Sequence, residues 1–219
     1  MNFTTRFFHT FSLRLVLAIA LSFAGLTAQA DIQPGKEYEL LTQPQPVETG
    51  KKIEILEIFS YGCIHCYHLD PDLNKWVKTL PKDVAFRRLP AIFNTSWTPL
   101  AKAFYTFETM GLTEKLHGDF FIAIHEQHMR FDDDDAVFDW VEKHGVNRKN
   151  FIAMYNSFSV QSEALRSKQL TKNYGITGVP TLIVDGKYRT SVSAAGGQAG
   201  LMSVLDQLIK KARQEHAGK

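Results

Sequence analysis

The sequence has little cysteine, little excess charge and, after its first thirty residues, no long apolar run. Its 25 basic and 23 acidic side chains nearly cancel, so the chain lacks the strongly positive surface that nucleic-acid-binding proteins carry. No stretch after residue 30 is apolar for the roughly 20 residues that a membrane-spanning helix needs. Internal repeats are absent as well. These shortages exclude a nucleic-acid-binding protein, a multi-span membrane protein and a repeat protein.

The two cysteines, Cys63 and Cys66, are too few for the common metal and haem sites. A structural zinc site needs four ligands, and the chain has no second Cys-x-x-Cys. Covalent haem attachment requires a histidine directly after the second cysteine, where this chain has Tyr67. His125 and His128 stand three residues apart, not the four of a zinc-protease helix, so we expect an exposed helix end there. No metal site is predicted.

The first thirty residues predict a secretory signal peptide. Arg6 and Arg14 make a positive start without acidic residues, residues 15–26 are mostly apolar, and Ala-Gln-Ala at 28–30 has the small residues of a cleavage site. An uncleaved membrane anchor is the alternative, but the apolar run is shorter than the roughly 20 residues of a spanning helix. We therefore expect an exported, nearly neutral mature chain that begins at about Asp31.

The apolar periodicity of the remaining chain predicts an α/β domain that is interrupted by helices. With 44% hydrophobic residues and 16 phenylalanines, the chain can bury the core of one or two domains. Residues 97–174 show only helical spacing, with five helices that end at glycines or turns. Around this block we expect strands at residues 53–59, 84–89, 181–184 and 187–190, a short edge strand at 38–41, a helix at 63–80 and a last helix after Gly197.

Cys63 and Cys66 are better explained by chemistry than by stabilisation of the fold. A disulfide across two residues closes a very small loop, and the stabilisation from chain entropy grows with loop length. Cys63 follows an apolar strand and opens a helix, and the N-terminus of a helix favours a thiolate over a thiol. Cys66 lies one helical turn further and should be less accessible. The spacing therefore predicts a reversible disulfide in which Cys63 reacts and Cys66 resolves.

Three further residues are candidates for roles near this pair. His65 lies between the cysteines, where a partly positive imidazole stabilises the Cys63 thiolate and makes the disulfide a stronger oxidant. Glu57 interrupts an apolar strand, so it is either a buried proton acceptor beneath the cysteines or a rim position open to water. Pro180 follows Val179 at the start of a predicted strand, a position at which a cis bond usually marks a functional turn.

These residues resemble the DsbA family of the thioredoxin superfamily over essentially the whole mature chain. The motif at residues 63–66 is similar to the family's active site, although Ile64 stands where its best-known pattern has proline. Val179-Pro180 resembles the cis-proline loop that faces the cysteines, and Glu57 falls at the family's buried acid. The resemblance implies a thioredoxin fold with an inserted all-helical domain: residues 31–95 and 166–219 form the thioredoxin-like domain and 96–165 the insertion.

The resemblance also implies an activity and its partners. A member of this family is a periplasmic thiol:disulfide oxidoreductase that donates its disulfide, here Cys63–Cys66, to newly secreted polypeptides. The pair itself is the redox centre, so no cofactor is expected, and Ile64, Val179 and Pro180 would contact the substrate. The implied partners are cysteine-containing unfolded chains and a DsbB-like, quinone-linked membrane protein that restores the disulfide. A monomer is expected.

Two other functions remain open at this point. A disulfide isomerase or reductase of the same compartment would use the same dithiol, although isomerases usually carry a dimerisation domain and residues 31–50 are too few for one. A chaperone-like binding module would keep the fold without turnover. Modules of that kind typically lose one cysteine or the cis proline, and this chain keeps both Cys63 and Cys66 together with Pro180.

Overall fold

The computed structural model describes residues 31–131 and 133–218. The predicted signal peptide, residues 1–30, lies outside the described residues. Within the described part, none of the helices is both long and apolar enough to cross a membrane.

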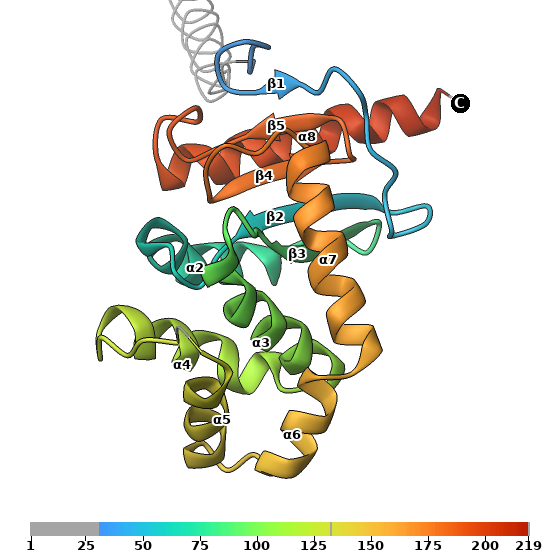
Figure 1. Ribbon diagram of the computed structural model, residues 1–219. Helices are drawn as coiled ribbons and strands as arrows, with labels where there is room; N and C mark the ends of the chain where they lie inside the picture. Colours follow the sequence, from blue (N-terminus) through green and yellow to red (C-terminus); the bar gives the residue numbers. More distant parts are fainter. Residues whose placement is uncertain (1–30, 132, 219) are drawn as a thin grey trace, which may run out of the picture. The chain divides into compact units, whose positions relative to one another are not determined.

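A sheet with strand order β1-β5-β4-β2-β3 forms the centre of the fold (Figure 1). The central strand β2 (Ile53–Phe59) pairs in parallel with β3 (Val84–Pro90) and antiparallel with β4 (Thr181–Val184). Strand β5 (Tyr188–Thr190) follows β4 through a hairpin, and β1 (Glu39–Leu40) pairs with it at the edge. Every residue of β2 is buried, including Glu54 and Glu57, the two acidic residues in an otherwise apolar strand. All five strands that the sequence predicts are present.

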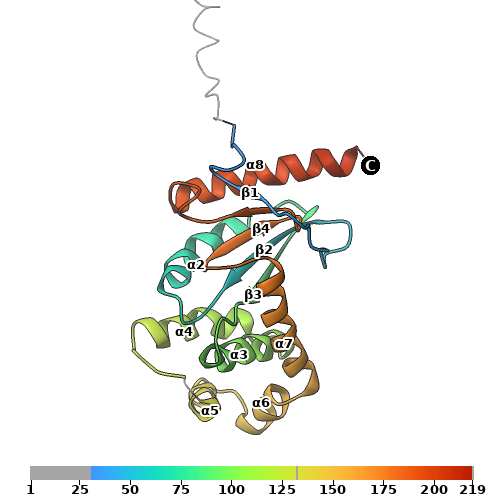
Figure 2. The same cartoon turned by 45° about the horizontal axis from the view of Figure 1, so that its top comes forward.

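Helices cover both faces of the sheet. Helices α2 (Ile64–Val77) and α8 (Gln198–Ala217) pack on one face, where the apolar sides of both helices meet β2 and β4 (Figure 2). Helix α7 (Phe158–Asn173) and the segment after it cover the other face, with Tyr174 and Ile176 packed against Leu56 and Ile58 of β2. The sheet is therefore the middle one of three layers.

The helical block has a core of its own. It consists of a 3₁₀ turn η1 (Thr95–Trp97) and the helices α3 (Thr98–Thr109), α4 (Thr113–His125), α5 (Asp134–Lys143), α6 (Arg148–Tyr155) and α7. Aromatic rings fill its interior, and Trp140 packs against Phe107, Phe120 and Phe131. Phe59, Tyr61 and Cys66 belong to the same cluster, so the core of the block reaches the end of β2.

Helix α7 joins the helical block to the sheet without interruption. It begins at Phe158, where Ser157 caps it by accepting from the amide of Val160. Farther along, the Ser167 hydroxyl donates to the carbonyl of Pro90 at the end of β3, at 2.6 Å. The predicted boundary between residues 165 and 166 thus falls inside a continuous helix that serves both parts.

Candidate active site

Cys63 lies at the junction of β2 and α2, as the sequence predicts. It is the N-cap of α2, its amide donates to the carbonyl of Ser60, and its carbonyl accepts from the amide of Tyr67. Cys66 lies one turn inside the helix and is fully buried, whereas Cys63 is half-buried. Both cysteines are free thiols in this structure, so it represents the reduced form.

The surroundings separate the two thiols chemically. A hydrogen bond from the Cys66 thiol, followed by the backbone N–H groups of Cys66 and His65 and by the charge of His65, lowers the pKa of Cys63 from 9.0 to about 6 against the opposing effect of burial. Burial, and the same hydrogen bond to Cys63, raise the pKa of Cys66 well above its ordinary value. Cys63 is therefore a thiolate at neutral pH and Cys66 a thiol. The sequence predicted this direction, but not that Cys66 itself is the largest cause.

The two residues between the cysteines face outward. His65 is exposed, and Ile64 has 41% of its surface accessible. The charge of His65 contributes least among the causes that lower the pKa of Cys63, so it supports the thiolate without dominating it. Ile64 therefore presents an apolar side chain to solvent directly after Cys63 in the chain.

The Val179-Pro180 segment lies opposite Cys63. The peptide bond between these two residues is cis, and the Cys63 thiol donates to the carbonyl oxygen of Val179 at 3.3 Å. A pocket of about 870 Å³ continues from this loop. Its lining includes His65 and His68 from α2, residues 175–181 and residues 191–194. The pocket is therefore bordered by the Val179-Pro180 loop and by His65, which lies between the two cysteines.

Glu57 is buried beneath the cysteines, so the alternative of a rim position open to water is wrong. Only 1% of its surface is accessible, and Oε2 accepts from Nε of Arg88 at 2.8 Å. Burial raises its pKa from 4.5 to about 7, with Arg88 opposing this shift and the charges of Asp70 and Cys63 adding to it. A carboxyl with this pKa exchanges protons at neutral pH.

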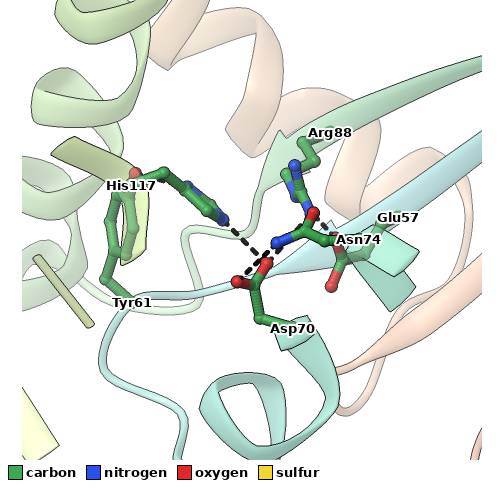
Figure 3. Close-up of polar contacts among 6 residues, drawn as sticks. All are labelled: Glu57, Tyr61, Asp70, Asn74, Arg88 and His117. Atoms are coloured by element: carbon green, nitrogen blue, oxygen red, sulfur yellow. Dashed lines mark hydrogen bonds and ion pairs between the residues drawn. The ribbon is translucent and has the colours of Figure 1, made fainter. Parts of the chain in front are cut away.

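Glu57 belongs to a buried polar network that the sequence did not reveal (Figure 3). Nη2 of Arg88 donates to Oδ1 of Asp70 at 3.0 Å and to the side-chain oxygen of Asn74 at 2.7 Å. Oδ1 of Asp70 also lies 3.1 Å from Nε2 of His117 on α4, and Nδ1 of His117 lies 2.8 Å from the Tyr61 hydroxyl. A charged side chain on the buried face of an apolar strand or helix predicts such a network, and Glu57 was identified in this way. Asp70 has the same signature, because it lies between the buried residues Leu69 and Leu73.

The end of α4 is not a freely exposed helix end, which corrects one prediction. His125 is half-buried, its Nε2 lies 2.8 Å from the carbonyl oxygen of Tyr61, and its ring stacks on Tyr67. Tyr67 in turn donates to Glu126. His128 is exposed as expected. In residues 31–131 and 133–218, no three ligating side chains are grouped to hold a metal ion.

The fold and the site together define a thioredoxin-like protein with one ionisable, accessible thiol and one buried thiol. The sequence pattern of the family described as "DSBA-like thioredoxin domain" matches residues 82–207. The chain is 43% identical over 197 residues to the thiol:disulfide interchange protein DsbA of Pseudomonas syringae pv. tomato, covering 89% of this chain and 92% of the relative. For the corresponding protein of Pseudomonas aeruginosa, the identity is 41% and the coverage 92% and 95%.

Solved structures give the same result. The crystal structure of Pseudomonas aeruginosa DsbA superposes with a TM-score of 0.82 at 40% identity, covering 86% of this chain and 98% of that one. The oxidoreductase NmDsbA1 of Neisseria meningitidis superposes with a TM-score of 0.79 at 27% identity, with coverage of 86% and 98%. The chain belongs to the DsbA family of thiol:disulfide oxidoreductases. The predicted thioredoxin fold with helices inserted into it is confirmed.

Proposed function

We propose that the protein is an exported dithiol oxidase that passes the disulfide between Cys63 and Cys66 to cysteine pairs of newly exported polypeptides. One observation carries the proposal: the pKa of Cys63 is lowered to about 6 while burial keeps Cys66 a thiol. A stabilised thiolate stabilises the reduced form, and a disulfide whose reduced form is stable is a strong oxidant. Relatives that share about two fifths of the sequence carry the name thiol:disulfide interchange protein.

The reaction proceeds through a mixed disulfide. A substrate thiolate attacks Sγ of Cys63, which forms the mixed disulfide and releases the Cys66 sulfur with an electron pair. A second substrate thiolate then attacks the substrate sulfur and releases Cys63 as a thiolate. The substrate loses two electrons and its two thiol protons as its own disulfide forms. The electrons stay on the two cysteines.

Glu57 donates a proton to Cys66 and accepts it back. The departing Cys66 sulfur needs a proton because its thiol form is strongly favoured, and the carboxyl of Glu57, with a pKa of about 7, supplies it. Reoxidation runs in the opposite direction, and Glu57 then accepts the proton. Ile64, Val179 and Pro180 form the surface on which the substrate chain lies while Cys63 reacts.

Reoxidation requires a partner that accepts two electrons. We assign this step to a DsbB-like, quinone-linked membrane protein, in keeping with the family. The compartment is the periplasm, reached through the predicted signal peptide at residues 1–30, and the mature chain begins at about Asp31. The redox centre is the cysteine pair, as in other members of the family.

A redox titration against glutathione tests the proposal. The equilibrium between the Cys63–Cys66 disulfide and the dithiol is measured by the fluorescence of the tryptophans, and both redox forms are unfolded in denaturant. We expect an oxidising potential and a reduced form that is more stable than the oxidised form. A reduced form no more stable than the oxidised one would refute a strong oxidant.

A cysteine variant separates an oxidase from the other functions. Cys63→Ser should abolish oxidation of a reduced model substrate, whereas a chaperone-like module would continue to suppress aggregation and to function in cells. Refolding of a substrate with scrambled disulfides tests isomerase activity in the unmodified protein. Turnover of scrambled disulfides well above the rate of simple oxidation would favour the isomerase.

A further inference from the structure

The buried network connects the helical block to the acid beneath the cysteines. Arg88 on β3 serves two carboxylates, since Nε donates to Glu57 and Nη2 donates to Asp70. The Asp70 oxygen that accepts from Arg88 is also the oxygen within 3.1 Å of His117. Glu57, Asp70 and Arg88 lie on the sheet and on α2, whereas His117 comes from α4. One side chain of the inserted helices, His117, is thus hydrogen-bonded to a carboxylate that shares Arg88 with Glu57.

The hydrogen bonds define the state of His117. The ring is buried among Phe59, Tyr61 and Phe121, and burial lowers the pKa of His117, so the imidazole is neutral at pH 7. The Asp70 carboxylate can only accept, so Nε2 carries the proton and donates to it. Nδ1 is then the acceptor, and the Tyr61 hydroxyl donates to it. This tautomer satisfies both ring nitrogens without adding a charge to the core.

We propose that His117 is a positioning residue for the proton-exchange site: by holding Asp70 against Arg88, it divides the guanidinium charge between Asp70 and Glu57. The inference deepens the proposed function, because it rests on Glu57 as the group that exchanges the proton of Cys66. It adds a contribution from the inserted helices to a reaction whose thiols and acid all lie in the thioredoxin-like part.

Glu57 and Asp70 compete for a single cation, the guanidinium of Arg88. Arg88 lowers the pKa of Glu57 and offsets part of the effect of burial, which is the largest cause of the raised value. With Asp70 charged and held on the same guanidinium, Glu57 receives only part of that compensation. Glu57 is therefore partly protonated at neutral pH and can exchange a proton with Cys66.

Titratable and charged groups on each surrounding element affect the protonation of Glu57. Arg88 stands on β3, and Asp70, Cys63 and Cys66 belong to α2 and its cap. His117 faces Asp70 and Arg88 from α4. Burial raises the pKa of Tyr61, in the loop after β2, and the charge of Glu108 on α3 adds to this effect together with the carboxylates of the network. Of these groups, Asp70 and His117 are the two that can alter how strongly Arg88 pairs with Glu57. Neither is a cysteine or Glu57 itself.

The test measures the protonation of Glu57 directly. The oxidised protein is labelled with ¹³C at glutamate side-chain carboxyls, and the Glu57 signal is assigned by its loss in Glu57→Gln. We expect the midpoint of its titration to fall by about one pH unit in Asp70→Asn and to fall in the same direction, by less, in His117→Phe. His117→Gln, which keeps an N–H donor toward Asp70, should restore the midpoint. A Glu57 midpoint unchanged or raised in a folded His117→Phe protein would overturn the proposal.

Two controls separate this role from a structural one. His144→Phe removes a histidine of the same helical block that stacks on Trp140 and has no contact with the network, so it should leave the Glu57 titration unchanged. A purely structural His117 would lower the stability of both redox forms and leave the titration where it was. If His117→Phe does not fold, the smaller His117→Leu carries the same expectation.

A second measurement keeps the two hypotheses apart. Cys63 is loaded with glutathione as a mixed disulfide, and the release of glutathione by Cys66 is followed as a function of pH. If Glu57→Gln keeps the unmodified protein's pH profile, then Glu57 does not exchange the proton, and the proposed function of this residue fails. The carboxyl titration still decides whether His117 divides the charge of Arg88.

Discussion

Sγ of Cys63 lies 3.3 Å from the carbonyl oxygen of Val179, across a sequence separation of 116 residues. As a thiol, Cys63 donates to this oxygen. When Cys63 ionises it has no proton to donate, and the carbonyl becomes available to accept an N–H from another chain. The chemical state of the thiol is thus coupled to the hydrogen-bonding capacity of the loop beside it.

The causes of the thiolate at Cys63 can be ranked by mutation. Cys66→Ala should raise the pKa of Cys63 more than His65→Ala does, because the thiol of Cys66 is the largest cause of the low value and the charge of His65 is the smallest. Ultraviolet absorbance of the thiolate, followed against pH, measures both variants. A larger rise in His65→Ala would contradict the hydrogen-bond account.

The stability of the reduced form should depend on pH through Cys63. Its pKa is lowered from 9.0 to about 6 in the folded state, so the thiolate stabilises the fold above the unfolded value and this contribution is lost as the pH falls through about 6. After allowance for partial exposure, we expect about 1 kcal/mol in favour of the reduced form at pH 7.

Denaturant unfolding of both redox forms between pH 5 and 8 measures this effect. Glu57 is present in both forms and largely cancels in their difference, whereas the thiolate exists only in the reduced form. The difference in unfolding free energy should shrink toward acid pH. A difference that stays constant across this range would exclude the thiolate as its source.

Glu57→Gln should stabilise the protein at alkaline pH. The pKa of Glu57 is raised from 4.5 to about 7, so its contribution is fully present below the unfolded value and is lost as the pH rises through about 7. The uncharged amide avoids this loss. We expect a gain of about 2 kcal/mol at pH 8 and little change near pH 4, since Arg88 keeps Asp70 as a partner.

Unfolding of the oxidised variant and the oxidised parent protein across this pH range checks the sign. The oxidised form is used because it contains no ionisable thiol. Destabilisation at pH 8 would mean that the ion pair with Arg88 outweighs the burial of the carboxylate.

The hairpin between β4 and β5 offers a test of the fold. Gly186 has φ of +63°, and a Cβ there would lie 2.0 Å from the carbonyl oxygen of Gln45. Gly35 has φ of +82° but open space around it, so it is a matched control. Gly35→Ala should cost about 1 kcal/mol for the left-handed backbone. Gly186→Ala should cost about 3 kcal/mol, because the segment that carries Gln45 must also move.

Thermal unfolding of the two alanine variants measures the comparison. Equal losses of stability at Gly35 and Gly186 would show that the segment around Gln45 moves without a cost in free energy.

Much of the fold was accessible from the sequence because its elements follow local rules. The buried strand at residues 53–59 and the strand at 181–184 have the predicted bounds, and each is mostly apolar. The helices of the insertion end where glycines adopt positive φ, as at Gly111 and Gly145. The first helix ends at Val77 and not at the predicted Leu80, because apolar spacing continues past the last helical turn.

The sequence by itself determined the reactive pair. Two cysteines separated by two residues at a strand-to-helix junction specify which thiol is exposed and which is buried, since both properties follow from the local geometry of a helix start. The identity of the loop around Val179 and Pro180 also followed from sequence, through its resemblance to a known family.

Only the tertiary structure decided the environment of that pair. Arg88 reaches Glu57 because β3 pairs beside β2, and His117 reaches Asp70 because the helical block packs on the end of the sheet. Such contacts join residues far apart in the chain, and no local pattern encodes their distance. Ion pairs and hydrogen bonds act over a few ångströms, so the proton affinity of Glu57 becomes defined only when the chain has folded.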